Sequence, residues 1–137
     1  MSASAWATLV PELSCRDLDR SLVFWTEILG FSVRFDREEE RFAYLERGWA
    51  QVMLEEANGG WETGPLEEPF GRGINLQIEV EDVVALHRHV IAAGVPMFRD
   101  LRVVEYRNGT EVHRAHEFLI QDPDGYLVRL VQDPDVA

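Results

Sequence analysis

The sequence has few of the features that would point to secretion or to a membrane. It contains a single cysteine, Cys15, so no disulfide can form within the chain, as is typical of proteins in a reducing cytoplasm. Residues 1–8 have neither the basic region nor the apolar run of a signal peptide. No stretch is long and apolar enough to span a membrane. We therefore expect a cytoplasmic protein without a membrane partner.

Positive charge is also scarce. The 137 residues include 25 acidic and 13 basic side chains, which gives a formal net charge of −12. Non-specific binding of nucleic acid needs basic patches, so we expect no nucleic-acid partner, and the charge favours cationic molecules instead. The alternative is that the acidity only keeps the protein soluble.

Common catalytic motifs are absent as well. The chain has no phosphate-binding loop, no CxxC pair and no HExxH sequence. His87 and His89 are two residues apart in an expected helix, and therefore lie on different faces. His113 and His116 have no evident carboxylate partner in the sequence, and Cys15 is expected to be an inert buried thiol rather than a nucleophile. We predict no catalytic residue and no cofactor.

The chain does contain one pattern that occurs twice. In the first copy, an apolar stripe at helical spacing covers residues 18–29, begins after the N-cap residue Asp17 and ends at Gly30. In the second copy, a similar stripe lies between Asp82 and Gly94. Each helix is therefore expected to have a start signal and a stop signal.

Strands are expected on both sides of each helix, because apolar and polar residues alternate there. The expected strands cover 9–15, 31–36, 41–46 and 50–56 in the first copy, and 74–80, 95–99, 114–121 and 126–132 in the second. The sequence thus predicts one α+β domain of two βαβββ modules, with a curved mixed sheet forming a cleft and helices on its outer face. The modules span about 7–57 and 73–133, and a Gly/Pro-rich linker, 58–72, joins them.

Two connections carry aromatic residues that are candidates for ligand contact. Trp61 and Phe70 lie in the linker, where the alternative role is packing alone. Tyr106 lies in an expected loop, 104–112, whose Asn108-Gly109 pair predicts a hairpin turn.

The sheet faces away from the helices are expected to line the cleft. In the first strand of the second module this face is polar throughout, with Asn75, Gln77 and Glu79. Glu12 and Glu55 lie on the corresponding face of the first module. The alternative is a solvated outer face, which is common in antiparallel sheets.

Several motifs in these modules resemble those of the vicinal oxygen chelate superfamily, which includes glyoxalase I, extradiol dioxygenases, fosfomycin-resistance enzymes and bleomycin-resistance proteins. The resemblance covers about residues 7–133, and segments 46–48, 52–55 and 122–132 are most similar to the bleomycin-resistance branch. The motifs that carry it are Arg16-Asp17-Leu18, Phe24-Trp25, Leu29-Gly30-Phe31, Asp122-Pro123-Asp124-Gly125-Tyr126 and Leu130-Val131.

The resemblance implies four positions for metal ligands, and in this sequence they hold Val10, Met53, Asn75 and Arg129. A divalent metal needs carboxylates, thiolates or neutral imidazoles, and these residues offer no such set. We therefore predict that no metal is bound. The alternative is a metal-dependent lyase, isomerase or dioxygenase with rearranged ligands.

The bleomycin-resistance branch implies non-enzymatic binding of a cationic, flat-tailed antibiotic in clefts between the subunits of a homodimer. Phe42 occupies the position of one stacking aromatic, while Arg114 occupies the other, which favours a related planar or smaller molecule over bleomycin itself. Another alternative is a dimeric module that has lost its ligand. The predicted ligand-binding residues are Glu12, Phe42, Tyr44, Met53, Glu55, Trp61, Asn75, Gln77, Glu79, Tyr106, Arg114 and Arg129.

Overall fold

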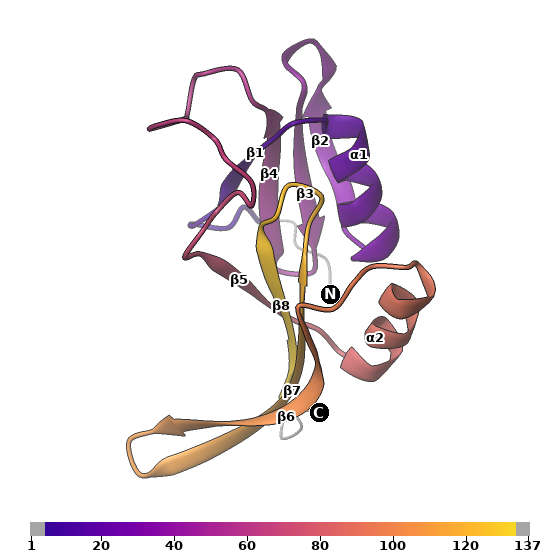
Figure 1. The fold of residues 1–137 in the computed structure, drawn as a ribbon, viewed down its shortest axis with the longest axis vertical. Helices are drawn as coiled ribbons and strands as arrows, with labels where there is room; N and C mark the ends of the chain where they lie inside the picture. The colour runs from indigo at the N-terminus through magenta and orange to yellow at the C-terminus, as the bar shows by residue number, and fades with distance from the viewer. Residues whose placement is uncertain (1–4, 134–137) are drawn as a thin grey trace. The chain divides into compact units, whose positions relative to one another are not determined.

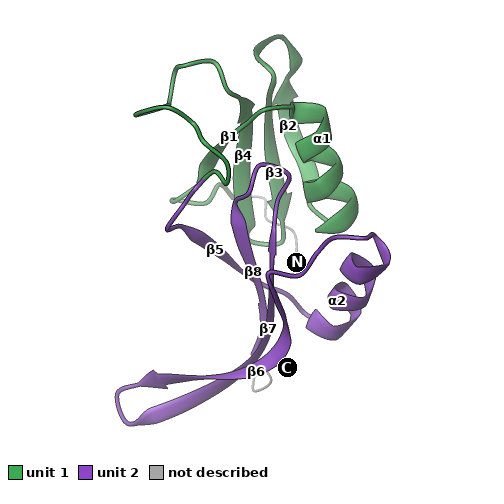
Figure 2. Ribbon diagram, in the orientation of Figure 1, with its two compact units in different colours: residues 1–70 green, residues 71–137 purple. Residues whose placement is uncertain are grey.

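The structure is a computed structural model that describes residues 5–133. It divides into two compact units, unit 1 at Met1–Phe70 and unit 2 at Gly71–Ala137 (Figure 2). The boundary between the units falls inside the predicted linker, 58–72. No helix in the described part of the chain is long and apolar enough to cross a membrane.

Each unit combines one helical segment with a four-stranded mixed sheet (Figure 1). The sheet orders are β1-β4-β3-β2 and β5-β8-β7-β6. The first pair in each order is parallel: β1 with β4 in one sheet, and β5 with β8 in the other. The predicted pair of βαβββ modules is therefore confirmed. Unit 1 consists of β1 (Glu12–Cys15), α1 (Leu18–Val23), β2 (Ser32–Arg37), β3 (Phe42–Arg47) and β4 (Ala50–Glu56), and unit 2 of β5 (Asn75–Glu79), α2 (Val83–Ala92), β6 (Arg99–Asn108), β7 (Glu111–Gln121) and β8 (Leu127–Gln132).

Both helices begin at the predicted aspartates. The Asp17 carboxylate accepts hydrogen bonds from the backbone N–H groups of Asp19 and Arg20 at 3.1 and 3.3 Å, and Asp82 accepts one from Ala85 at 3.0 Å. These bonds satisfy amides that have no partner within the helix.

The first helical segment is less regular than its apolar stripe predicts. After α1 it continues as a π-helical turn, Phe24–Ile28. The Thr26 hydroxyl donates to the Leu22 carbonyl at 2.6 Å, and the Leu29 N–H reaches back to the Phe24 carbonyl at 3.0 Å. Such side-chain bonds to the preceding turn compete with the regular α-helical ladder. Gly30 then ends the segment with a φ of 79°.

Each hydrophobic core lies between a helix and one face of its own sheet. Trp25 is fully buried in unit 1 and makes edge-to-face contacts with Phe24 and Phe31. Val83 and Val90 of α2 are fully buried in unit 2. Cys15 is 1% exposed, so the prediction of a buried thiol is confirmed.

One part of the second module was predicted wrongly. The expected strand 95–99 and the expected loop 104–112 are replaced by β6 and the first residues of β7, which form a long antiparallel hairpin. The many charged residues near the tip are typical of a loop. In the structure the two strands nevertheless pair along this stretch, for example Glu105 with Arg114 and Tyr106 with His113. The predicted turn is confirmed, because β6 ends at Asn108 and Gly109 has a φ of 64°.

The turn between β7 and β8 generates a stability prediction. One oxygen of the buried Asp122 carboxylate accepts from the backbone N–H groups of Asp124, Gly125 and Tyr126 at 2.9, 3.0 and 3.0 Å. Asp122→Ala should lower the free energy of unfolding by about 1–3 kcal/mol, because it removes a buried acceptor that three backbone amides share; Gly125 keeps its bond to the Asp122 backbone carbonyl at 2.9 Å. Urea unfolding measures the loss. Asp122→Asn keeps an acceptor oxygen and should lose less; equal losses would contradict this account.

Candidate small-molecule site

In unit 1, five of the predicted ligand-binding residues share the sheet face opposite α1. The strand register places Glu12 and Tyr44 on either side of Met53, so these three form one row across the sheet. Phe42 lies opposite Glu55 in the next row. Side chains on one strand face alternate with those on the other, which is why the sequence could group these residues.

The two aromatic residues of this face are already packed. Phe42 is 2% exposed, and the Arg37 guanidinium lies 4.1 Å from its ring centroid. Tyr44 is stacked on Phe35 at 5.2 Å between ring centroids, and its hydroxyl is hydrogen-bonded to Gln51. A ligand could therefore stack on Phe42 only after Arg37 had moved away. The sequence did not indicate this role of Arg37, because it depends on the pairing of β2 with β3, which places Arg37 opposite Phe42.

Trp61 is arranged differently. Trp61 comes shortly after β4 in the chain and is 67% exposed. Its indole N–H donates to the Glu55 carboxylate at 2.9 Å. Partial burial and the charge of Glu55 raise the pKa of Glu12, while Arg37 acts in the opposite direction. The unit thus presents an exposed, oriented indole beside two neighbouring carboxylates.

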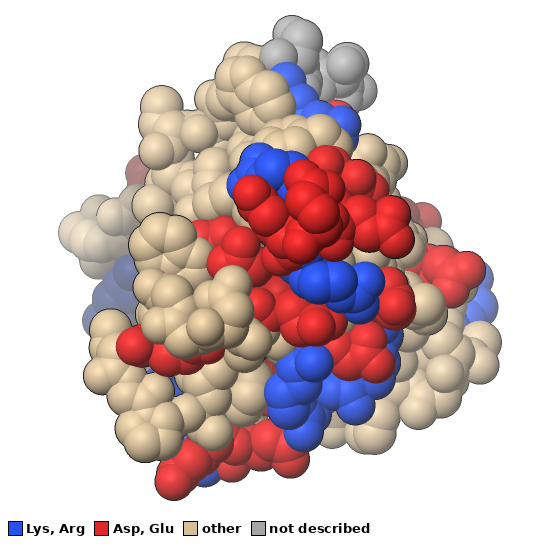
Figure 3. All heavy atoms as spheres, turned by 90° about the horizontal axis from the view of Figure 1, so that it is seen from above, with Lys and Arg blue, Asp and Glu red and all other residues tan. Residues whose placement is uncertain are grey.

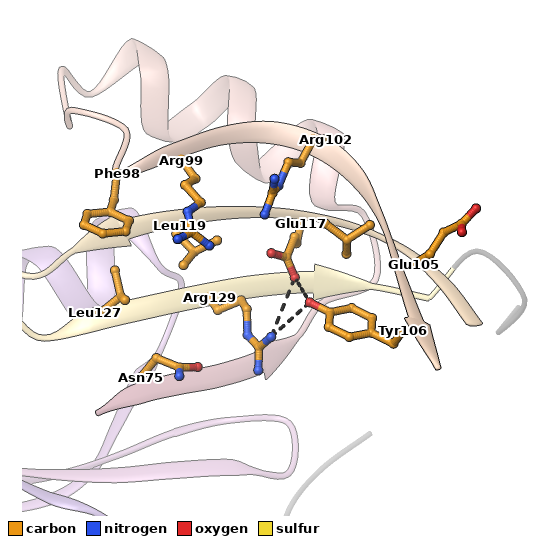
Figure 4. A pocket seen from close by; sticks show the side chains of 11 residues that line it. Asn75, Phe98, Arg99, Arg102, Glu105, Tyr106, Glu117, Leu119, Leu127 and Arg129 are labelled. Carbon is orange, nitrogen blue, oxygen red and sulfur yellow. Dashed lines mark hydrogen bonds and ion pairs between the residues drawn. The ribbon is translucent and has the colours of Figure 1, made fainter. Parts of the chain in front are cut away.

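In unit 2, a cavity of about 480 Å³ lies against β6, β7 and β8 (Figure 4). Arg129 donates to the Tyr106 hydroxyl at 3.0 Å and lies 3.9 Å from Glu117, and the Tyr106 hydroxyl donates to Glu117. Burial, followed by the hydrogen bond and charge of Glu117, raises the pKa of Tyr106, and Arg129 opposes that shift. Of the residues predicted to bind ligand, Asn75, Tyr106 and Arg129 line this cavity.

The remaining predicted residues of this unit line a smaller hollow. Gln77, Glu79 and Arg114 border a space of about 330 Å³, together with Tyr106 and Arg129. The Arg114 guanidinium also pairs with Glu105, at 3.2 Å.

The charge of the larger cavity differs from the sequence-based expectation of an acidic cleft. Arg99, Arg102 and Arg129 line it, against Glu105 and Glu117. The sequence did not indicate Arg99 and Arg102, because it predicts only a short strand that ends at residue 99 and not the long strand β6. Glu117 lies within the expected strand 114–121, where the sequence did not indicate a ligand-facing role. On the face of the molecule shown in Figure 3, by contrast, acidic side chains gather with arginines set among them.

Two histidines have carboxylate neighbours that the sequence did not indicate. His113 lies 3.3 Å from Glu111, and His87 lies 2.7 Å from Asp100. Both carboxylates are largely exposed, at 73% and 75% of the side chain. Exposed pairs of this kind contribute little to stability.

The module arrangement and the sequence define the class of protein. Residues 7–130 match the model of the Glyoxalase/Bleomycin resistance protein/Dioxygenase superfamily, and the chain belongs to that superfamily.

Two curated relatives and one solved structure agree with this assignment. A probable lactoylglutathione lyase of Vibrio cholerae is 30% identical over 85% of this chain and 83% of the relative, and one of Vibrio parahaemolyticus is 28% identical over 88% and 86%. The crystal structure of TioX from Micromonospora sp. ML1 has a TM-score of 0.71 at 20% identity, covering 93% of this chain and 99% of TioX, which supports the fold alone.

The residues at the implied metal-ligand positions do not fit a divalent metal. Val10 and Met53 lie in unit 1, and Asn75 and Arg129 line the cavity of unit 2. Arg129 brings a permanent positive charge, and its buried Nε has no hydrogen-bond partner among the residues that the structure describes. Within residues 5–133, no three His, Cys, Asp or Glu side chains come together in a group that could hold a metal. No catalytic step through a metal follows from this arrangement.

The contacts of Tyr106 generate a pH prediction. Its phenol should ionise above the ordinary pKa of 10.0. The neutral phenol is favoured in the fold, so its stabilising contribution is complete below the pKa of the unfolded chain and is lost as pH rises through the folded pKa. Ultraviolet titration should show a late-ionising tyrosine that is absent in Tyr106→Phe. In Glu117→Gln the pKa of Tyr106 should fall. A Tyr106 that ionises at or below the ordinary value would contradict the assignment.

Proposed function

We propose that the protein binds and sequesters a small, cationic and partly planar molecule without chemical conversion, as a protein of the bleomycin-resistance type. The observation that carries the proposal is the exposed Trp61 indole, held by Glu55 next to Glu12. The sequence motifs similar to the bleomycin-resistance branch support it, and the superfamily assignment is compatible with it.

The physical basis is the combination of a ring face and negative charge. An aromatic face attracts a cation through its quadrupole, and a carboxylate adds direct charge attraction. The hydrogen bond from the Trp61 indole to Glu55 restricts the ring before a ligand arrives, so less conformational entropy is lost on binding. We propose Trp61 as the principal stacking residue, because Arg37 already covers Phe42.

A second candidate function is a metal-dependent lyase with rearranged ligands. The names of the two Vibrio relatives favour it. The residues at the implied ligand positions oppose it, since arginine and valine cannot hold a divalent metal. Stoichiometric zinc, nickel, iron or manganese in the purified protein, together with lyase activity that a chelator abolishes, would favour the enzyme over the binding protein.

The binding proposal predicts the effects of two substitutions. Calorimetric titration with bleomycin and with proflavine, a small planar cation, should show that Trp61→Ala weakens binding by about 1 kcal/mol or more, because the stacking face is lost. Glu55→Gln should weaken binding and flatten its dependence on ionic strength, because a screened charge attraction is removed.

Matched variants separate these effects from general changes of the surface. Trp49→Ala removes another exposed tryptophan, and Glu39→Gln removes another exposed carboxylate of the same unit. Neither should alter affinity or its salt dependence. The proposal fails if the cations do not bind, or if the matched variants weaken binding as much as Trp61→Ala and Glu55→Gln do.

We also propose that the protein forms a homodimer, as the superfamily resemblance implies. Large apolar side chains remain exposed, among them Leu9 at 85%, Ile74 at 59% and Val103 at 55%, and such surfaces are often covered in an assembly. Sedimentation equilibrium at micromolar concentration should give twice the 15.7 kDa mass of one chain. A single species with the mass of one chain would show the proposal to be wrong.

A further inference from the structure

The cavity of unit 2 gathers positive charge in a chain that is strongly acidic. The chain has no lysine, so all 13 of its basic residues are arginines. Three of them, Arg99, Arg102 and Arg129, line this one cavity. Neither Arg99 nor Arg102 forms an ion pair with any other described residue.

The carboxylates at the cavity are already engaged. Glu117 is 2% exposed, accepts a hydrogen bond from Tyr106 and lies 3.9 Å from Arg129. Glu105 pairs with Arg114 at 3.2 Å. The charge of Arg99 and Arg102 is therefore left uncompensated by the residues around the cavity.

The strand register brings the three arginines onto one face. Leu119 on β7 is opposite both Arg99 on β6 and Arg129 on β8, and Arg102 is opposite Glu117 in the next row. Neighbouring strands lie about 4.8 Å apart, so Arg99 and Arg129 are separated by about 10 Å across Leu119, within the combined reach of two arginine side chains. Figure 4 shows Arg99 and Arg102 extending from β6 toward β7, and Arg129 extending from β8 toward Tyr106.

Apolar side chains complete the cavity. Phe98, which is 50% exposed, Leu119 and Leu127 border it beside the arginines. A volume of about 480 Å³ is within the range that holds small organic ligands. Guanidinium groups bind carboxylates through paired N–H donors and are weakly hydrated, so little solvation is lost when they pair.

We propose that this cavity is a binding site for a small organic carboxylate with an apolar, ring-sized body. Arg99 and Arg102 pair with the carboxylate, Arg129 adds positive charge, and Phe98 and Leu127 contact the body. The site lies within unit 2 and takes a ligand of opposite charge to the one proposed for Trp61 and Glu55. It therefore goes beyond the proposed function and does not depend on it.

Two probes of nearly identical shape test the role of charge. Calorimetric titration of the full chain with 2-naphthoate should show binding. Its neutral counterpart 2-naphthamide should bind more weakly, by a factor of about ten or more. Raising the ionic strength should weaken the binding of naphthoate and leave that of naphthamide nearly unchanged.

Matched substitutions locate the site. Arg99→Gln and Arg102→Gln should each weaken naphthoate binding several-fold, up to about tenfold, without changing the binding of naphthamide. Arg88→Gln removes the same charge from an exposed position on α2, which packs on the other face of the sheet, and should have no effect. Circular dichroism checks that each variant is folded.

The possible results are distinguishable. Equal binding of the acid and the amide, no binding of either at millimolar concentration, or an equal loss in Arg88→Gln would each overturn the proposal. Trp61→Ala should leave naphthoate binding unchanged, so failure of the cation site and failure of the carboxylate site would be observed independently.

Discussion

Each four-stranded sheet of this protein can bury only one of its faces against a helix, and strand geometry fixes which residues occupy the other. Because side chains alternate along a strand, burying Leu13 and Leu54 in unit 1 turns Glu12 and Glu55 to the opposite face. In unit 2, burying Leu130 turns Arg129 in the same way. The hydrophobic cores thus determine where the polar chemistry can be.

The two modules have the same topology but opposite chemistry on these free faces. Unit 1 places two carboxylates near the exposed Trp61, whereas unit 2 places three arginines around the larger cavity. A fold determines which positions face a ligand and leaves the residue types at those positions to vary. The same strand positions can therefore serve ligands of opposite charge.

Local signals in the sequence were sufficient for much of the fold. Asp17 and Asp82 begin the helices because their carboxylates meet free amides, and Gly109 closes the hairpin with a positive φ. The length of β6 and the position of Arg37 over Phe42 were not predictable, because both depend on pairing between strands. Cross-strand neighbours are set by register, which the pattern within one strand does not specify.

The buried carboxylate of Glu117 explains why Arg129 is suited to its position. A carboxylate that is 2% exposed needs a nearby positive charge and a hydrogen-bond donor, and Arg129 and Tyr106 supply them. A metal-binding carboxylate in place of Arg129 would leave two acids in one poorly solvated site, where like charges raise each other's pKa. Exchanging the arginine for a metal ligand would therefore require a change at Glu117 as well.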